Sequence, residues 1–219
     1  RLRRAGAPDL ARQWEERLAE EQEDAGNYAE PDTWLDGDHT LEVGNRAIEA
    51  VATPGHTRGH YVFADLQDGL LFAGDHVLPT ITPSIGFEPA AAELPLRDFL
   101  GSLVKVRQLP DMRLLPAHGP VTDSVHDRVD ELLDHHDVRL DLCEQALGAG
   151  PATGHGVASQ LPWTRRNRRF PDLDPFNAGL ATMETVAHLE LLVAQGRANS
   201  TIQHGQVVYE LRRRDGLQS

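Results

Sequence analysis

Residues 53–60 read Thr-Pro-Gly-His-Thr-Arg-Gly-His and directly follow a run of apolar residues that predicts a β-strand. Two further segments have the same setting, Phe-Ala-Gly-Asp-His at residues 72–76 and Leu-Pro-Ala-His-Gly-Pro at residues 115–120. Each therefore begins a loop at the end of a predicted strand. Loops of this kind place side chains on a rigid scaffold and leave them accessible, so these segments are the first candidates for a functional site.

The three segments carry the candidate metal ligands His56, Asp75 and His118. Imidazole nitrogen and carboxylate oxygen are preferred ligands of Zn²⁺. A glycine beside each of them allows the backbone to turn tightly and a metal to approach closely. Each residue taken singly would be read as an ordinary loop or turn residue. The three together, in this order, favour a metal site.

These segments resemble, in order, the third, fourth and fifth metal motifs of the metallo-beta-lactamase superfamily. Their spacing fits that family, with 75 − 56 = 19 positions between the first two candidate ligands and 118 − 75 = 43 between the last two. The stretch from residue 36 to residue 44 resembles the strand that precedes the first of these motifs. The C-terminal region is similar to the winged helix of one branch of these hydrolases, so the resemblance covers residues 35–211.

The resemblance implies a role for each ligand: His56 binds a first zinc, Asp75 bridges two zincs, and His118 binds the second. It implies a zinc-dependent hydrolase in which a metal-bound hydroxide attacks a carbonyl ester or thioester, with Asp75 as the catalytic residue shared by both metals. His60 is not a ligand in that pattern and is expected to support its loop. We expect the three ligands to converge within about 8 Å, since paired metals lie about 4 Å apart.

The sequence departs from the family at its earliest metal motif, HxHxDH, which supplies four further ligands. The strings at residues 38–39 and 134–137 have a different spacing, so three of seven expected ligands are present. We therefore expect residues 1–219 alone to bind zinc poorly and to hydrolyse little.

Two explanations stay open for the missing motif. Either the segment lies upstream of Arg1, or the chain is an inactive remnant that acts as a binding or nucleic-acid-interaction module through its winged helix. The first is favoured, because losing half the fold would expose an apolar sheet face and an unpaired strand edge.

Composition narrows the partners. The net charge is −13, from 34 acidic and 21 basic residues, which counts against nucleic acid. The helix expected over residues 180–195 contains no lysine or arginine. No apolar run approaches the roughly 20 residues that cross a bilayer. The single cysteine, Cys143, allows no intrachain disulfide and suits a cytoplasmic protein. We expect a small ester or thioester substrate, no membrane partner, and leave a homo-oligomer open.

The pattern of apolar residues predicts an α+β chain. Residues 1–150 are expected to form the C-terminal part of a metallo-beta-lactamase αββα sandwich with an incomplete N-terminal half, and residues 151–219 a winged-helix-like domain. Helices are expected over residues 8–24, 96–106, 125–147, 153–161 and 180–194. Strands are expected over residues 41–43, 48–52, 61–64, 70–73, 113–116, 198–201 and 207–211.

Four further features bear on function. His135 and His136 are expected to be a solvated pair, because adjacent helical residues do not face the same way. Whether His76 reaches the site is left open. The loop over residues 79–95 is mostly apolar, which favours an ester or thioester over a phosphate. The arginines between residues 165 and 169 are expected to form a solvated loop.

Overall fold

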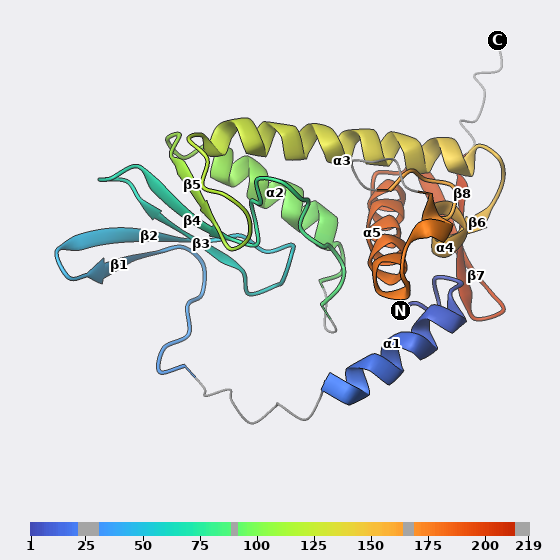
Figure 1. Ribbon diagram of the computed structural model, residues 1–219. Helices are drawn as coiled ribbons and strands as arrows, with labels where there is room; N and C mark the ends of the chain where they lie inside the picture. The colour runs from blue at the N-terminus through green and yellow to red at the C-terminus, as the bar shows by residue number, and fades with distance from the viewer. Residues whose placement is uncertain (22–30, 89–91, 164–168, 213–219) are drawn as a thin grey trace, which may run out of the picture. The chain divides into compact units, whose positions relative to one another are not determined.

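The computed structural model describes residues 1–21, 31–88, 92–163 and 169–212. Strands and helices follow one another in a mixed α/β order (Figure 1). In chain order the elements are α1 (Pro8–Glu21), β1 (His39–Val43), β2 (Arg46–Ala52), β3 (Tyr61–Asp65), β4 (Leu70–Gly74), α2 (Pro95–Arg107), β5 (Arg113–Pro116), α3 (Val125–Leu147), β6 (Ala152–Thr153), α4 (Gly154–Ala158), the 3₁₀ helix η2 (Phe170–Asp172), α5 (Pro175–Ala194), β7 (Ala198–Gln203) and β8 (Gln206–Leu211). The chain divides into two compact units, residues 28–137 and residues 1–27 with 138–219.

The unit of residues 28–137 is built on a five-stranded sheet in the order β1-β2-β3-β4-β5. The first four strands are antiparallel to their neighbours, and β5 runs parallel to β4. The expected turn at Gly44 joins β1 to β2 with two residues, since Val43 pairs with Arg46. Gly44 has a φ of 65°, which glycine adopts without strain.

The two faces of this sheet differ in burial. One face is closed, and its neighbouring residues Val62, Leu71 and Leu114 are fully buried. The same unit contains α2, whose buried residues Leu96, Phe99, Leu103 and Val106 follow a helical period, and Figure 1 shows α2 beside the sheet. The regular alternation along each strand thus places one set of apolar residues in the core.

The opposite face, called here the open sheet face, consists of residues that pair across the strands: Leu41, Val43, Ile48, Phe63, Phe72 and Leu115. Phe72 is 45% exposed and Val43 is 59% exposed. The other four are partly buried. Among the described residues of this unit the five-stranded sheet is the only sheet, so no second sheet packs on the open sheet face there.

The second unit contains α1, whose Trp14 packs on α5. The Trp14 ring stacks on Phe176 with 5.1 Å between ring centroids, and its Nε1 donates a hydrogen bond to the Pro175 carbonyl at 3.2 Å. A Cβ on Gly179 would lie 2.3 Å from that Nε1. Only glycine therefore fits at this point of α5, and the close approach of the indole ring follows from it.

The C-terminal strands form a separate sheet in the order β6-β8-β7. A two-residue turn at His204 and Gly205, both with positive φ, joins β7 to β8 as expected. The short strand β6 was not expected. The order of helices followed by a ribbon is the expected one, and assignment as a winged helix stays a prediction.

Two expectations lie outside the described residues, and the expected domain boundary differs from the division into compact units. The continuation of the first helix to residue 24 and the arginines at 165–168 lie outside the described residues. The expected division near Gly150 falls within the second unit, which also includes residues 1–27. Separate folding of two domains divided at that point stays a prediction.

Candidate functional site

Strand direction explains why the three candidate loops share one edge of the five-stranded sheet. β2 and β4 are both antiparallel to β3, and β5 is parallel to β4, so all three run the same way. His56 follows β2, Asp75 follows β4, and His118 follows β5. The carboxyl ends of co-directed strands meet at one edge of a sheet, and loops there commonly carry functional residues.

The loop that carries His56 is fixed at both ends. The Thr53 amide donates to the His60 carbonyl at 2.8 Å, which closes the loop into a compact turn. Ser102 on α2 donates its hydroxyl to the Pro54 carbonyl at 2.8 Å. A Cβ on Gly55, whose φ is 143°, would lie 2.4 Å from the Phe99 Cα. The loop thus rests directly on α2, and only glycine allows that approach.

The His56 ring is oriented by a backbone carbonyl. Its Nδ1 lies 2.8 Å from the Ser84 carbonyl oxygen, and a carbonyl can only accept, so Nδ1 carries the proton. Nε2 then keeps its lone pair. A histidine that ligates a metal through one nitrogen commonly donates the other to a carbonyl in this way, which fixes both tautomer and ring orientation.

Asp75 and His118 come together after the parallel strands β4 and β5. His118 Nε2 lies 3.4 Å from Asp75 Oδ1. The Ala117 amide donates to the Gly74 carbonyl at 2.9 Å, which ties the two loops at their start. His118 is 70% exposed, whereas Asp75 is half-buried. The pair presents a carboxylate and an imidazole to the same accessible point, as metal ligands would.

His60 supports the Asp75 turn. Its Nε2 accepts a hydrogen bond from the Asp75 amide at 3.2 Å, and its Nδ1 lies 2.9 Å from Thr53 Oγ1. Burial lowers the pKa of His60 to about 4; nearby His56 adds to this effect and Asp75 opposes it. Both hydrogen bonds require a neutral ring with its proton on Nδ1, and the lowered pKa keeps the ring in that form. The structure thus agrees with a supporting role.

His76 lies in the core. It is fully buried, and its ring packs edge-on against Phe99 with 4.9 Å between centroids. Burial lowers its pKa to about 3, with a further lowering by His60 that the Ser102 backbone opposes. This ring is therefore neutral at ordinary pH and packs as an apolar group.

The expected solvated pair on α3 is wrong for His136, which is fully buried. His136 lies on the same helical stripe as Val129, Leu132 and Leu140, and its ring packs against Phe99 at 5.5 Å. The helical period explains the burial of His136, because 3.6 residues per turn place it on the same buried face of α3 as these apolar residues. His135, one position earlier, is partly exposed.

The structure brings Asp75 and His118 into contact, and the His56 ring lies 6.2 Å from the His60 ring between centroids. Convergence of all three on one metal position stays a prediction. In the described part of the chain, no group of three or more histidine, cysteine or acidic side chains is arranged to hold a metal ion. The supporting groups Ser84 and Thr53 were not expected, because a backbone carbonyl and a threonine hydroxyl leave no distinctive pattern in a sequence.

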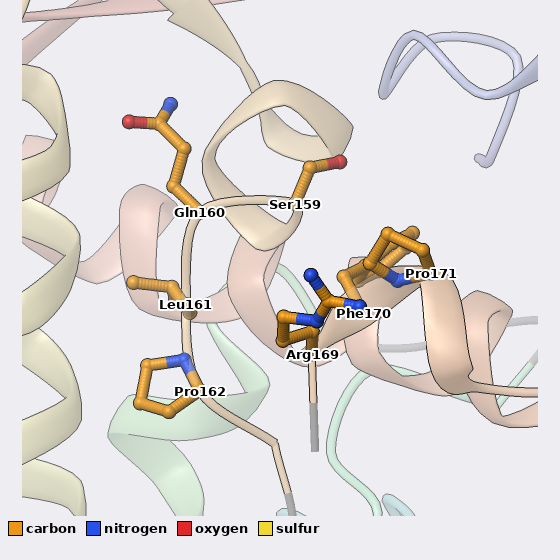
Figure 2. A pocket seen from close by; sticks show the side chains of 7 residues that line it. All are labelled: Ser159, Gln160, Leu161, Pro162, Arg169, Phe170 and Pro171. Carbon is orange, nitrogen blue, oxygen red and sulfur yellow. The ribbon is translucent and has the colours of Figure 1, made fainter. Parts of the chain in front are cut away.

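A separate pocket of about 420 Å³ occurs in the second unit (Figure 2). None of the candidate ligands contributes to its wall, which consists of Ser159, Gln160, Leu161, Pro162, Arg169, Phe170 and Pro171. Among the described helices, none is long and apolar enough to cross a bilayer.

Comparison with known proteins points to one family. The sequence profile described as "Metallo-beta-lactamase superfamily" matches residues 2–118. A protein of Caenorhabditis elegans named "Beta-lactamase-like protein 2 homolog" is 34% identical over 102 residues, which cover 47% of this chain and 32% of the relative. A protein of Bartonella henselae named "Hydroxyacylglutathione hydrolase" is 40% identical over 88 residues, which cover 38% of this chain and 31% of the relative.

The fold has a counterpart among solved structures. The crystal structure of a beta-lactamase domain protein from Burkholderia ambifaria superposes with a TM-score of 0.79 at 27% identity, and covers 96% of this chain and 60% of that chain. The chain spans about a third of the length of the two curated relatives. The structural similarity therefore extends over nearly all of this chain and 60% of the Burkholderia ambifaria chain. The sequence similarity to the two curated relatives covers less than half of this chain and about a third of each relative.

Proposed function

Because the chain belongs to the metallo-beta-lactamase superfamily, we propose that it supplies part of the metal site of a zinc-dependent hydrolase. His56, Asp75 and His118 each contribute one donor, and Asp75 is shared between two metal positions. The remaining ligands come from an HxHxDH segment that residues 1–219 do not contain. The donor set fits zinc, which binds imidazole nitrogen and carboxylate oxygen.

One arrangement carries this proposal: three strand-end loops place an oriented imidazole and a contacting carboxylate–imidazole pair at one edge of the sheet. The Ser84 carbonyl fixes His56 with Nε2 available. His118 lies 3.4 Å from Asp75, and His60 holds the Asp75 amide. Ligands fixed in this way by neighbouring groups need little rearrangement when a metal binds.

The residues of this chain would hold and orient the metal ligands, and the bound metal would supply the chemistry. When bound, zinc lowers the pKa of water and polarises a carbonyl oxygen. Asp75 would hold both metal ions, because it is the ligand that the two positions would share. His60 supports the turn that carries this carboxylate, because its Nε2 accepts the hydrogen bond of the Asp75 amide.

The substrate that this site suits is a carboxylic ester or a thioester. The loop that follows Asp75 contains no lysine or arginine over residues 79–95, so it offers a phosphate no cationic partner. Two apolar side chains of this loop, Ile81 and Phe87, are 54% and 36% exposed. They provide an apolar surface for an acyl group. A related protein named for hydrolysis of a hydroxyacylglutathione thioester supports the same class.

The proposal is tested by comparing two chains, residues 1–219 alone and the same residues preceded by an HxHxDH segment. Elemental analysis measures zinc, and release of thiol from a generic thioester measures turnover. We expect the longer chain to hold about two zincs and to turn over, since each metal then has at least three protein ligands. The shorter chain should hold little. Two tightly bound zincs in the shorter chain would show that the ligand set proposed here is wrong.

A further inference from the structure

The segment of residues 77–88 lies outside every helix and strand, yet it touches both histidine ligand loops. The Ser84 carbonyl accepts the His56 Nδ1 proton at 2.8 Å. A Cβ on Gly119, the neighbour of His118, would lie 2.9 Å from the Pro79 Cγ, so proline and glycine are in close contact there. The segment therefore contacts the His56 ring directly and the loop of His118 through Gly119.

Arg128 on α3 holds that segment. Its Nε donates to the Leu78 carbonyl at 2.6 Å, and its Nη2 donates to the Ile81 carbonyl at 2.9 Å. Its Nη1 donates to Glu131 Oε2 at 2.7 Å, and the side chain is only 11% exposed. A guanidinium group offers several donors in one rigid plane, so one side chain fixes two carbonyls at once.

The chain between this clamp and His56 is short and well packed. Ser84 lies three residues after Ile81, and Pro83 between them is buried. Ile85, on the far side, is also buried. With both neighbours in the core and Ile81 fixed by a charged donor, the Ser84 carbonyl has little freedom to leave the His56 ring. The Arg128 hydrogen bond to the Ile81 carbonyl therefore restrains the Ser84 carbonyl, and through it the His56 imidazole.

We infer that Arg128 is a positioning residue of the metal site. It fixes the Leu78–Ser84 turn, and through the Ser84 carbonyl it sets the tautomer and orientation of His56; through Pro79 it also supports the His118 loop. The role towards a metal rests on the proposed function. The effect on the His56 ring does not, because it is a property of the metal-free chain.

The test uses residues 1–219 without metal, labelled with ¹⁵N-histidine, and reads the tautomer of each ring from two-dimensional ¹H–¹⁵N spectra. His56→Gln assigns the His56 signals. Arg128→Met removes the clamp, and Arg128→Lys keeps the charge but loses the planar fork. Arg107→Met is the matched control, because Arg107 pairs with Asp130 at 2.8 Å and contacts His126 at 2.9 Å, both outside the Leu78–Ser84 turn. Hydrogen exchange of residues 77–88 is measured in the same samples.

In the unchanged chain we expect His56 to be protonated on Nδ1. In Arg128→Met the Nδ1-protonated fraction should fall about twofold or more, and amides of the segment should exchange about tenfold faster, because two charge-assisted hydrogen bonds are lost. Arg128→Lys should lie in between, and Arg107→Met should match the unchanged chain. An unchanged His56 tautomer in a folded Arg128→Met protein would overturn the inference, as would an equal shift in Arg107→Met. Failure of the longer chain to bind zinc would refute the proposed function and leave these readings intact.

Discussion

His60 connects two loops through hydrogen bonds at both ring nitrogens. Replacing it by leucine leaves the Asp75 amide and the Thr53 hydroxyl without this partner. We expect His60→Leu to lower the free energy of unfolding by about 1–3 kcal/mol, the usual effect of leaving a buried polar group unsatisfied. His60→Gln, which offers an acceptor and a donor, should recover part of the loss. Urea denaturation measures both variants, and a His60→Leu protein as stable as the unchanged chain would refute this role.

The buried histidines predict a definite pH dependence. The folded-state pKa values of His60 and His76 are about 4 and about 3, below the ordinary value of 6.5. Below pH 6.5 the unfolded chain therefore takes up protons that the folded chain does not. Their contribution to stability is complete above about pH 6.5 and is lost as the pH falls towards 4 and then 3. We expect a loss of several kcal/mol over this range, with the larger part from His76 because its pKa is lowered further.

This pH dependence can be assigned to one ring by substitution. His76→Leu keeps a buried side chain of similar size but cannot take up a proton. Its unfolding free energy, measured by urea denaturation from pH 7 to pH 4, should fall less steeply than that of the unchanged chain. Parallel curves for the two proteins would contradict the assignment. The pKa values of the Asp38 and Asp111 carboxyl groups are also lowered, so their contribution to stability is present across this range. It is lost mainly below their ordinary pKa of 3.8.

At this scale the sequence supplied candidate ligands, whose shared role at a metal stays a prediction, and it indicated little of their surroundings. Motif and order pointed to His56, Asp75 and His118, because glycine and strand ends leave a pattern in sequence. The burial of His76 could not be predicted from the sequence, because His76 lies in an irregular turn where no helical or strand period indicates which side chains are buried. His136 shows the reverse case: helical period placed it on the buried stripe, and its polar character wrongly suggested solvent.

Among the elements, the docking of α1 on α5 depends on one glycine. A methyl group at residue 179 would meet the Trp14 ring at 2.3–2.5 Å. We expect Gly179→Ala to cost about 1–3 kcal/mol by overpacking, and Trp14→Leu in the same chain to relieve part of it. Gly101→Ala on α2 is the control: its Cβ would meet nothing within 4 Å, so it should stabilise by up to about 1 kcal/mol. Equal effects of the two substitutions on thermal unfolding would contradict this account.

The helices and longer strands could be predicted because each has a clear period and a glycine or proline at its ends. β5 and α3 begin and end at the expected residues. The two-residue strand β6 and the single turn η2 could not be found in this way. Elements so short contain no full period, and β6 exists because it pairs with β8, more than fifty residues later in the chain. Their formation depends on tertiary contacts that local sequence does not encode.

For the molecule as a whole, the open sheet face predicts self-association of residues 1–219. Phe72 and Val43 are 45% and 59% exposed on this face, and exposed apolar side chains on one face favour association. We expect Phe72→Ser to weaken association about tenfold, in line with the burial of one large apolar side chain. Sedimentation velocity measures it, with Ile202→Ser on β7, where the side chain is 70% exposed, as the control. An equal effect of both substitutions would exclude this face as the contact.

Asp75 is proposed to be the ligand that two metals share. This role is tested by measuring the zinc content and thioester turnover of Asp75→Ala in a chain that includes an HxHxDH segment. The control is Asp123→Ala, which removes a fully exposed carboxylate that follows His118 by five residues. We expect about two zincs and full turnover in the control. In Asp75→Ala we expect loss of zinc and no measurable turnover, because both metals lose a ligand at once. Retention of two zincs and full turnover in Asp75→Ala would contradict this role.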